Sequence, residues 1–352
     1  MKKILVTALE ASANLHFSYV LEELKKLEDI KICGIFDKKF GIPLYESKEF
    51  SAMGFVEILP LIFKAKRALK ELVEIAKTCD EILLIDSPAF NLPLAKALKK
   101  ANVKAKITYY ILPQVWAWKP HRVKIVEEFC DNLASILPFE KKFYSKAVYV
   151  GHPLLDEIDL KNDGKNFNAI AFLPGSRKSE ISRLMPIFRE ILPNFKEKKY
   201  LVIPPNFKSN LPDFYGDVSG FEIVSGTKEI LSKSDFAFVC SGTATLEAAL
   251  IGVPFVLCYK AKAIDIFIAR IFVKLKFVGL ANIILDFCGK QKLHEELIQN
   301  DLNVQNLMQV YQKCDKQKFL KTCDEIRDYL SFGSAKNLAK LILEKELLWK
   351  NQ

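Results

Sequence analysis

Residues 236–247 read FAFVCSGTATLE, an apolar run followed at once by small residues and then by a helical pattern. A strand–turn–helix unit of this kind places the unpaired amide groups and the positive dipole end of a helix beside the end of a strand, where an anion is favoured. Ser241, Gly242 and Thr243 are small enough to let a diphosphate approach the backbone. Glu247, one turn further on, could accept hydrogen bonds from ribose hydroxyls. Taken alone, such a pattern is more often only a helix N-cap.

A second loop has the same design. In residues 169–177, an apolar run leads through Gly175 and Ser176 to Arg177, which is expected in the first turn of a helix. The helix dipole disfavours a cation there, and an anionic ligand would offset this cost. The alternative is an ordinary solvated arginine. Two such loops in one series of strands favour a phosphate site.

Along the rest of the chain, short apolar runs alternate with longer helical patterns, a rhythm typical of βαβ units. Runs that are apolar at every position suit the strands of a parallel sheet covered on both faces. Strands are expected at residues 4–8, 32–36, 82–85, 106–111 and 133–137, and then at 169–173, 200–203, 222–224, 236–240 and 255–259; helices include 17–27, 61–77 and 93–100.

The polar, turn-rich stretch 160–168 separates the two series of strands. We therefore predict an α/β protein with two Rossmann-like domains, residues 1–165 and 166–333. Ligands of such domains bind at the carboxyl ends of the strands, so we expect an interdomain cleft to hold them. A helical pattern at about 334–350 is predicted to pack back on the first domain.

The composition narrows the class of protein. The 352 residues include 52 Lys and Arg against 42 Asp and Glu, a net charge of +10 that favours phosphates, acidic head groups or nucleic acid as partners. No basic and aromatic cluster of a known module supports nucleic-acid binding. The eight cysteines include no Cys-x-x-Cys pair, which indicates reduced thiols in a cytosolic protein rather than disulfides or a zinc site.

The opening residues MKKILVTALEAS resemble a signal peptide, but their apolar run is short and a first strand is the better interpretation. The sequence has no uncharged apolar stretch of about 18 residues, so any membrane contact is expected to be peripheral. It also lacks an Asp-x-Asp pair, the usual holder of a metal-bound diphosphate. The amide groups of the turns and Arg177 would then have to carry the charge of the leaving group, and no metal or other cofactor is expected.

A series of short motifs is spread over most of the chain. They are EAS 10–12, MGFVE 53–57, IDSP 85–88 with FN 90–91, PQVWAW 113–118 with Arg122, LPFE 137–140, GHP 151–153, LPGSR 173–177, and SGTATLE 241–247 followed by Pro254 and YK 259–260. Together they resemble the lipid-A-disaccharide synthase family. Their order and spacing, and above all VWAW with LPGSR and SGTATLE, make the resemblance specific.

The resemblance implies the two-Rossmann-domain (GT-B) glycosyltransferase fold. It implies a UDP-2,3-diacylglucosamine donor, or its diamino analogue, and an acylated glucosamine 1-phosphate acceptor. The products would be a β-1,6-linked disaccharide 1-phosphate and UDP, formed with inversion and without a metal. The protein is expected to be cytoplasmic and to associate peripherally with the inner membrane. A homodimer is left open.

Inversion by direct displacement needs one general base to accept the proton of the attacking hydroxyl. Asp86 follows an apolar strand, and the family's essential aspartate falls on this position. Without the resemblance, a loop-capping aspartate would be the more frequent interpretation. Glu10 is the alternative base or an acceptor-positioning carboxylate. His152 is a weaker candidate, more often a packed residue.

The chain departs from the family's pattern at two loops. Leu9, Ala13 and Asn14 stand where the family's first motif has glycine, glycine and aspartate, so a less open loop is expected after the first strand. Ala89 replaces a common acidic residue, which leaves Asp86 as the single carboxylate of its turn.

Two sets of contacts complete the predicted site. The residues assigned to the UDP-sugar are Gly175, Ser176, Arg177, Ser241, Gly242, Thr243, Glu247 and Asn282. The residues assigned to the acceptor or to lipid are Ser12, Met53, Trp116, Trp118, Arg122, Arg270, Lys274 and Lys276. The two tryptophans could line an acyl-chain groove, although such residues are more often core.

Two amphipathic segments are candidates for lipid contact. Residues 61–73 place apolar side chains on one helical face and cations elsewhere, as interfacial helices do. A domain helix with its apolar stripe turned inward is an equal alternative. Residues 264–278 form an almost wholly apolar pattern with three interspersed cations, which favours lipid over deep burial.

Three other functions fit parts of these patterns: a transferase acting on an undecaprenyl-linked peptidoglycan precursor, a UDP-sugar epimerase, and a non-catalytic lipid carrier. VWAW and LPGSR argue against the first two. The acyl-chain length and the ester or amide linkage are not encoded in any of these motifs.

Overall fold

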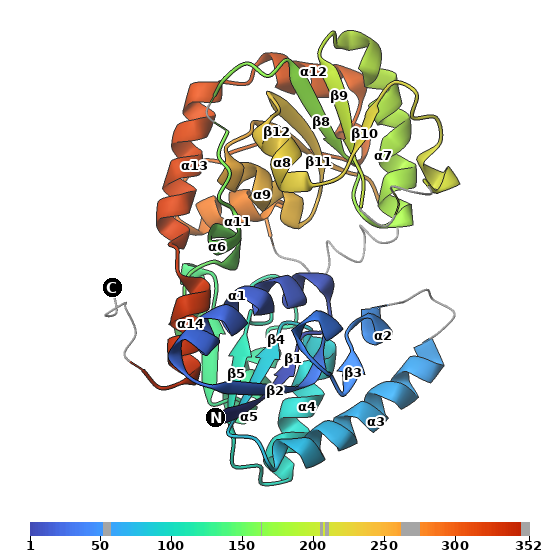
Figure 1. Ribbon diagram of the computed structural model, residues 1–352. Helices are drawn as coiled ribbons and strands as arrows, with labels where there is room; N and C mark the ends of the chain where they lie inside the picture. The colour runs from blue at the N-terminus through green and yellow to red at the C-terminus, as the bar shows by residue number, and fades with distance from the viewer. Residues whose placement is uncertain (52–57, 163, 205–206, 208–210, 262–274, 346–352) are drawn as a thin grey trace. The chain divides into compact units, whose positions relative to one another are not determined.

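The computed structural model describes residues 1–51, 58–162, 164–204, 207, 211–261 and 275–345 (Figure 1). The chain forms two compact units: residues 1–156 with those from Leu330 onward, and residues 157–329. The first unit ends before the turn-rich stretch 160–168, at which the sequence places the domain boundary. Each unit contains one parallel sheet flanked by helices, which confirms the predicted α/β fold class.

The sheet of the first unit has seven strands in the order β3-β2-β1-β4-β5-β6-β7. Strand order runs outward in opposite directions from β1 and β4, and ligands of open α/β sheets bind at such a switch point. The strands are β1 (Lys2–Thr7), β2 (Ile30–Phe36), β3 (Tyr45–Glu46), β4 (Glu81–Ile85), β5 (Lys106–Tyr110), β6 (Asn132–Ser135) and β7 (Ala147–Tyr149).

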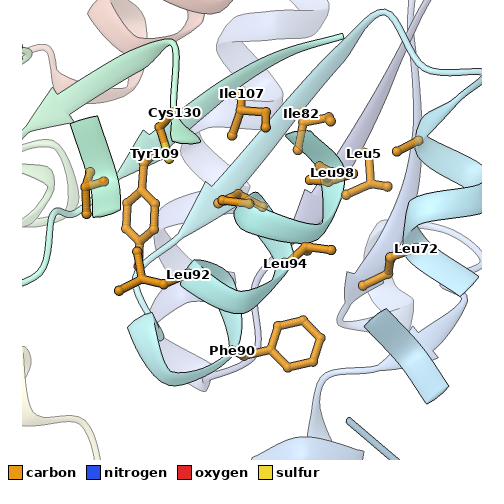
Figure 2. Close-up of a cluster of buried hydrophobic side chains, with 14 of the residues drawn as sticks. Leu5, Leu72, Ile82, Phe90, Leu92, Leu94, Leu98, Ile107, Tyr109 and Cys130 are labelled. Carbon is orange, nitrogen blue, oxygen red and sulfur yellow. The ribbon is translucent and has the colours of Figure 1, made fainter. Parts of the chain in front are cut away.

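Helices cover both faces of this sheet because alternate residues of each strand point to opposite faces. Leu5 and Ile82 pack in the cluster shown in Figure 2 with α3, α4 and α5. Ile4 and Leu83 pack on the other face with α1 and α14, so the tail helix completes the core of the first unit. The helices are α1 (Ala11–Leu27), α2 (Lys48–Ser51), α3 (Ile58–Ala76), α4 (Pro88–Lys100), α5 (Arg122–Phe129), α6 (Pro153–Glu157) and α14 (Ser334–Ile342).

The sheet of the second unit has six strands in the order β10-β9-β8-β11-β12-β13, with its switch point between β8 and β11. Its core is aromatic: the rings of Phe172 and Phe238 on these two strands stack with centroids 5.0 Å apart. The elements are β8 (Ala169–Leu173), α7 (Lys178–Ile191), β9 (Lys198–Val202), β10 (Glu222–Val224), α8 (Thr227–Ser232), β11 (Phe236–Cys240), α9 (Thr243–Ile251), β12 (Phe255–Tyr259), α11 (Leu280–Phe287), β13 (Glu296–Ile298), α12 (Val304–Gln312) and α13 (Lys316–Leu330).

The elements differ from the sequence predictions at a few places. The strands β3, β7 and β13 were not predicted, because runs of two or three residues give at best a weak periodic signal; of the strands this short, only β10 was predicted. A helix was predicted over residues 264–278. Its first part lies outside the described residues, which exclude 262–274, and residues 275–278 are irregular rather than helical. No helix in the described part of the chain is long and apolar enough to cross a membrane.

Candidate active site

A pocket of about 450 Å³ lies at the carboxyl edge of the second sheet, beside the switch point between β8 and β11. It forms there because each of the two strands ends in a small-residue turn that opens a helix. The pocket brings together six of the residues predicted to bind the UDP-sugar: Gly175, Ser176, Arg177, Ser241, Gly242 and Thr243. The sequence did not indicate its other side, which is formed by Val202, Ile203 and Pro204 at the end of β9 and by Gly226 and Thr227 at the start of α8.

The turn after β8 is closed by Glu180. The Glu180 carboxylate accepts hydrogen bonds from the amides of Ser176 (3.3 Å) and Arg177 (3.2 Å), and it pairs with the Arg177 guanidinium at 2.8 Å. Gly175 has φ +99°, and a Cβ there would stand 2.6 Å from Glu180 Oε2. The unfavourable interaction expected between the Arg177 cation and the helix dipole is therefore already offset by the Glu180 carboxylate. The glutamate three residues after the N-cap is a capping signal that the sequence contained.

The turn after β11 is different because α9 begins without a side-chain cap. Its N-cap residue Gly242 has φ +142°, and the space around the position of its missing Cβ is open to 4 Å. Thr243 is the first helical residue, so its amide and that of Ala244 belong to the unpaired set at a helix N-terminus, whereas the Thr245 amide already donates to Gly242 O at 3.1 Å. Of the two turns, this one offers the better-exposed anion site.

Two residues assigned to the UDP-sugar do not line this pocket. Glu247 lies on α9 and is half-buried. Asn282 on α11 is completely buried: its amide nitrogen donates to His294 O (3.0 Å) and Glu296 Oε1 (2.8 Å), and its oxygen accepts from the amide of Leu293 (2.8 Å). In this structure Asn282 holds the segment between α11 and β13.

The two candidate bases follow adjacent strands of the first sheet. Glu10 is the exposed N-cap residue of α1, just after β1, and Asp86 directly follows β4. Burial raises the pKa of Asp86 and the charge of Glu10 raises it further, whereas a hydrogen bond from the Ser87 amide and the nearby His16 lower it. A carboxyl group with a raised pKa is a stronger base than an ordinary aspartate once it is ionised.

Three hydrogen bonds fix the backbone of Asp86. Its amide donates to Tyr110 O at 2.9 Å, and its carbonyl accepts from Tyr109 Oη (2.6 Å) and from Asn91 Nδ2 (2.8 Å). Asp86 and Ser87 have φ of 48° and 43°, a left-handed conformation that costs free energy in residues other than glycine. Asn91, which is fully buried and also accepts from Thr7 Oγ1, therefore fixes this turn.

Comparison with known proteins identifies the family. The model of the lipid-A-disaccharide synthetase family matches residues 4–341. The lipid-A-disaccharide synthase of Campylobacter jejuni is 56% identical over 98% of this chain and 100% of its own length. That of Helicobacter pylori is 45% identical over 96% of this chain and 97% of its own length. The chain belongs to the lipid-A-disaccharide synthase family. It is thereby a glycosyltransferase of lipid A biosynthesis.

Solved structures with low sequence identity support the fold. Acinetobacter baumannii MurG matches with a TM-score of 0.58 at 14% identity, over 98% of this chain and 100% of its own. Staphylococcus aureus MnaA, solved with UDP, matches with a TM-score of 0.63 at 13% identity, over 99% and 100%. Both likenesses confirm the predicted GT-B type of fold.

The departure from the family's first motif has a structural reason in this chain. Asn14 donates from Nδ2 to Ala8 O and Glu10 O, both at 2.8 Å, and its Oδ1 accepts from the amide of Asp37 at 2.7 Å. An ionised aspartate has no donor for the two carbonyls. Asn14 therefore closes the loop that carries Glu10 by contacts that an aspartate could not make.

The VWAW segment divides between core and surface. Trp116 is buried, packs edge-on against Phe139 with centroids 5.4 Å apart, and donates to Glu140 at 3.4 Å. Trp118 is 42% exposed, with Lys119 Nζ 4.1 Å from its ring centroid. Arg122 is half-buried at the start of α5. Trp118 and Arg122 are thus available to a ligand, whereas Trp116 packs as core.

Glu140 is expected to make the stability of the first unit depend on pH. Burial raises its pKa to about 7, although Ser135 Oγ donates to it at 2.8 Å. Between its ordinary pKa of 4.5 and about 7, the unfolded chain releases this proton and the folded chain keeps it, so the contribution of Glu140 to stability falls as pH rises through this window. We expect Glu140→Gln to remove that fall, measured as urea midpoints near pH 5 and pH 8. The exposed Glu128→Gln is the control; an unchanged fall in Glu140→Gln would contradict the assignment.

The remaining candidates fall into two groups. Ser12 is exposed in the first turn of α1, and Lys276 is exposed ahead of α11. Met53, Arg270 and Lys274 lie outside the described residues.

Within residues 65–73, whose side chains the structure describes, the apolar stripe faces the core, as the domain-helix alternative predicts. Ala68 and Leu72 of α3 are fully buried against the sheet, because the helix must cover that face of the core. Phe63 near the start of α3 is an exception, with 69% of its surface exposed.

His152 is packed rather than poised for catalysis. It is 3% exposed, its amide donates to Ser331 O, and its Nδ1 accepts from the amide of Leu154 at 3.3 Å. Burial lowers its pKa to about 3, so the ring is neutral at physiological pH. The described residues contain no cluster of three or more His, Cys, Asp or Glu that could hold a metal ion.

Proposed function

We propose that the chain transfers 2,3-diacylglucosamine, or its diamino analogue, from UDP to the 6-hydroxyl of an acylated glucosamine 1-phosphate. The products are a β-1,6-linked disaccharide 1-phosphate and UDP. The observation that carries the proposal is the uncapped N-terminus of α9 at the switch point of the second sheet, in a chain of the lipid-A-disaccharide synthase family. Such a terminus suits the diphosphate of the donor.

The donor side of the reaction needs stabilisation of a leaving diphosphate. In our proposal the α9 amides receive the charge that develops on UDP, and no metal is required. Arg177, whose side chain is 80% exposed, can turn from Glu180 toward the phosphates. Glu247, one turn into α9, remains our candidate for the ribose hydroxyls.

The acceptor side needs a base. In our proposal Asp86 takes the proton of the attacking 6-hydroxyl as the bond to the anomeric carbon forms and the bond to UDP breaks. Burial and then the charge of Glu10 raise the pKa of Asp86, and Asn91 and Tyr109 hold its backbone in place. Trp118 and Arg122 are proposed to contact the acceptor.

The deciding experiment incubates the protein with UDP-2,3-diacylglucosamine and 2,3-diacylglucosamine 1-phosphate in the presence of a chelator. We expect stoichiometric UDP and a disaccharide 1-phosphate, detected by mass spectrometry. UDP release without a disaccharide would point to another acceptor, and lipid binding without turnover would point to a carrier. Turnover only after magnesium is restored would contradict metal independence.

We also propose that the enzyme works while bound peripherally at the cytoplasmic surface of the inner membrane, with exposed Phe63 of α3 among the residues that reach the lipid. Exposed Lys66 and Lys70 follow on the same helix and suit anionic head groups. We expect Phe63→Ser to lower co-sedimentation with phosphatidylglycerol vesicles several-fold. Phe332→Ser, at another exposed phenylalanine, is the matched control. Equal binding by both variants would exclude Phe63.

A further inference from the structure

Two cysteines of the first unit lie side by side. Cys33 is on β2, and Cys79 follows α3 just before β4; their sulfur atoms are 3.5 Å apart. A disulfide bond is about 2.0 Å long. The sulfurs therefore need to approach by only about 1.5 Å to become bonded. The pair is separated by 46 positions in the sequence, with no Cys-x-x-Cys spacing to reveal it.

The surroundings make the two thiols unequal. Both are half-buried, so a small oxidant can reach them. The hydrogen bond from Cys79 and the charges of Lys3 and Lys31 lower the pKa of Cys33. The same contact and burial raise the pKa of Cys79. Burial opposes the fall in the pKa of Cys33, but of the two thiols Cys33 is the one that ionises more readily, and thiolates are the species that react with oxidants.

We infer that Cys33 and Cys79 form an oxidation site, at which hydrogen peroxide converts the two thiols into an intrachain disulfide. The Cys33 thiolate attacks the peroxide oxygen, the O–O bond breaks, and a sulfenic acid and water form once the released hydroxide takes a proton. The Cys79 sulfur then attacks the Cys33 sulfur and expels a second water. Two thiols and one hydrogen peroxide give one disulfide and two waters.

The position of the pair indicates what the bond would do. Cys33 pairs in register with Leu5 inside the sheet, and Cys79 precedes β4, whereas Asp86 follows β4 at its opposite end. The disulfide would therefore tie α3 to the sheet without touching the carboxyl edge. It would close a long loop in the unfolded chain, which stabilises the folded state. We expect oxidation to raise the melting temperature by a few degrees and to leave UDP affinity unchanged.

The test treats the full chain with hydrogen peroxide, blocks the remaining thiols with an alkylating reagent, and maps tryptic peptides without reduction. We expect a cross-linked pair of peptides 32–38 and 78–96 that is lighter by two hydrogen atoms and separates on reduction. Cys314→Ser, at a half-buried cysteine elsewhere, should give the same cross-link. In Cys79→Ser, Cys33 should accumulate as a sulfenic acid that dimedone traps.

Three results would overturn the inference: peptides 32–38 and 78–96 alkylated as free thiols while the Cys314 peptide is oxidised, a cross-link only between different chains, or no dimedone adduct on Cys33 in Cys79→Ser. The peptide map of the unmodified sequence decides the matter even if a serine variant fails to fold. None of these readouts depends on the proposed transferase activity.

Discussion

Asp86→Asn is expected to lower turnover by roughly 10²–10⁴-fold, the usual contribution of general-base catalysis. An asparagine keeps the shape of the side chain and its contact with the Ser87 amide, but it cannot accept the proton of the acceptor hydroxyl. The backbone contacts from Tyr109 and Asn91 involve the carbonyl of residue 86 and remain available. UDP affinity, measured by calorimetry, should therefore stay within a few-fold of its original value.

The pH dependence of turnover distinguishes Asp86 from Glu10 as the general base. Because the pKa of Asp86 is raised, activity should fall on the acid side at a higher pH than an ordinary aspartate would give. Burial, the larger cause of the raised pKa, remains in Glu10→Gln, but the neighbouring charge that adds to it is removed, so the acid limb should move part of the way to lower pH while activity at neutral pH persists. If Glu10→Gln abolished turnover and Asp86→Asn did not, the two roles would be exchanged.

A matched control for Asp86→Asn is Asp29→Asn. Asp29 is an exposed aspartate just before β2, at the opposite edge of the same sheet. It should leave turnover unchanged. Normal turnover by Asp86→Asn would remove Asp86 from the mechanism.

Thr243→Pro is expected to weaken UDP binding by roughly ten- to a hundred-fold, the equivalent of about 1.5–3 kcal/mol for one hydrogen bond to a charged group. Thr243 is the first residue of α9, where proline is tolerated because its missing N–H has no partner within the helix. The substitution therefore removes one phosphate-binding amide and leaves the helix intact. Calorimetric titration with UDP measures the loss.

Thr243→Ala is the matched control, because it removes the hydroxyl and keeps the amide. It should bind UDP within a few-fold of the unchanged chain, and circular dichroism should show the same helix content in both variants. Equal weakening by alanine and proline would assign binding to the hydroxyl. Full affinity in Thr243→Pro would move the diphosphate away from α9.

Part of the candidate site could be predicted because its signals are local. FAFVCSGTATLE specifies a strand, a turn and a helix by itself, and the structure gives β11 and α9 at these residues. The same holds for the LPGSR turn, although the capping role of Glu180 was overlooked. The family motifs then assigned a role to Asp86 that no local pattern could give, since aspartate is common in such turns.

Other features depend on residues that are distant in sequence. Asn91 accepts a hydrogen bond from Thr7, which is 84 positions away. Glu140 accepts one from Trp116, and the sulfur atoms of Cys33 and Cys79 are in contact. Asn282 is the opposite case: the sequence places it among the predicted ligands, but once α11 and β13 are packed its amide nitrogen donates to the His294 carbonyl and the Glu296 carboxylate.

The sequence alone determined the alternation of strands and helices, the two phosphate-type turns and the family, because each is a property of neighbouring residues or of motif order. The tertiary structure decided which turn remains open to an anion, which tryptophan faces solvent, and how the pKa values of Asp86, Glu140 and Cys33 are shifted. Those properties arise from burial and from charges brought together by folding, and a linear pattern does not record either.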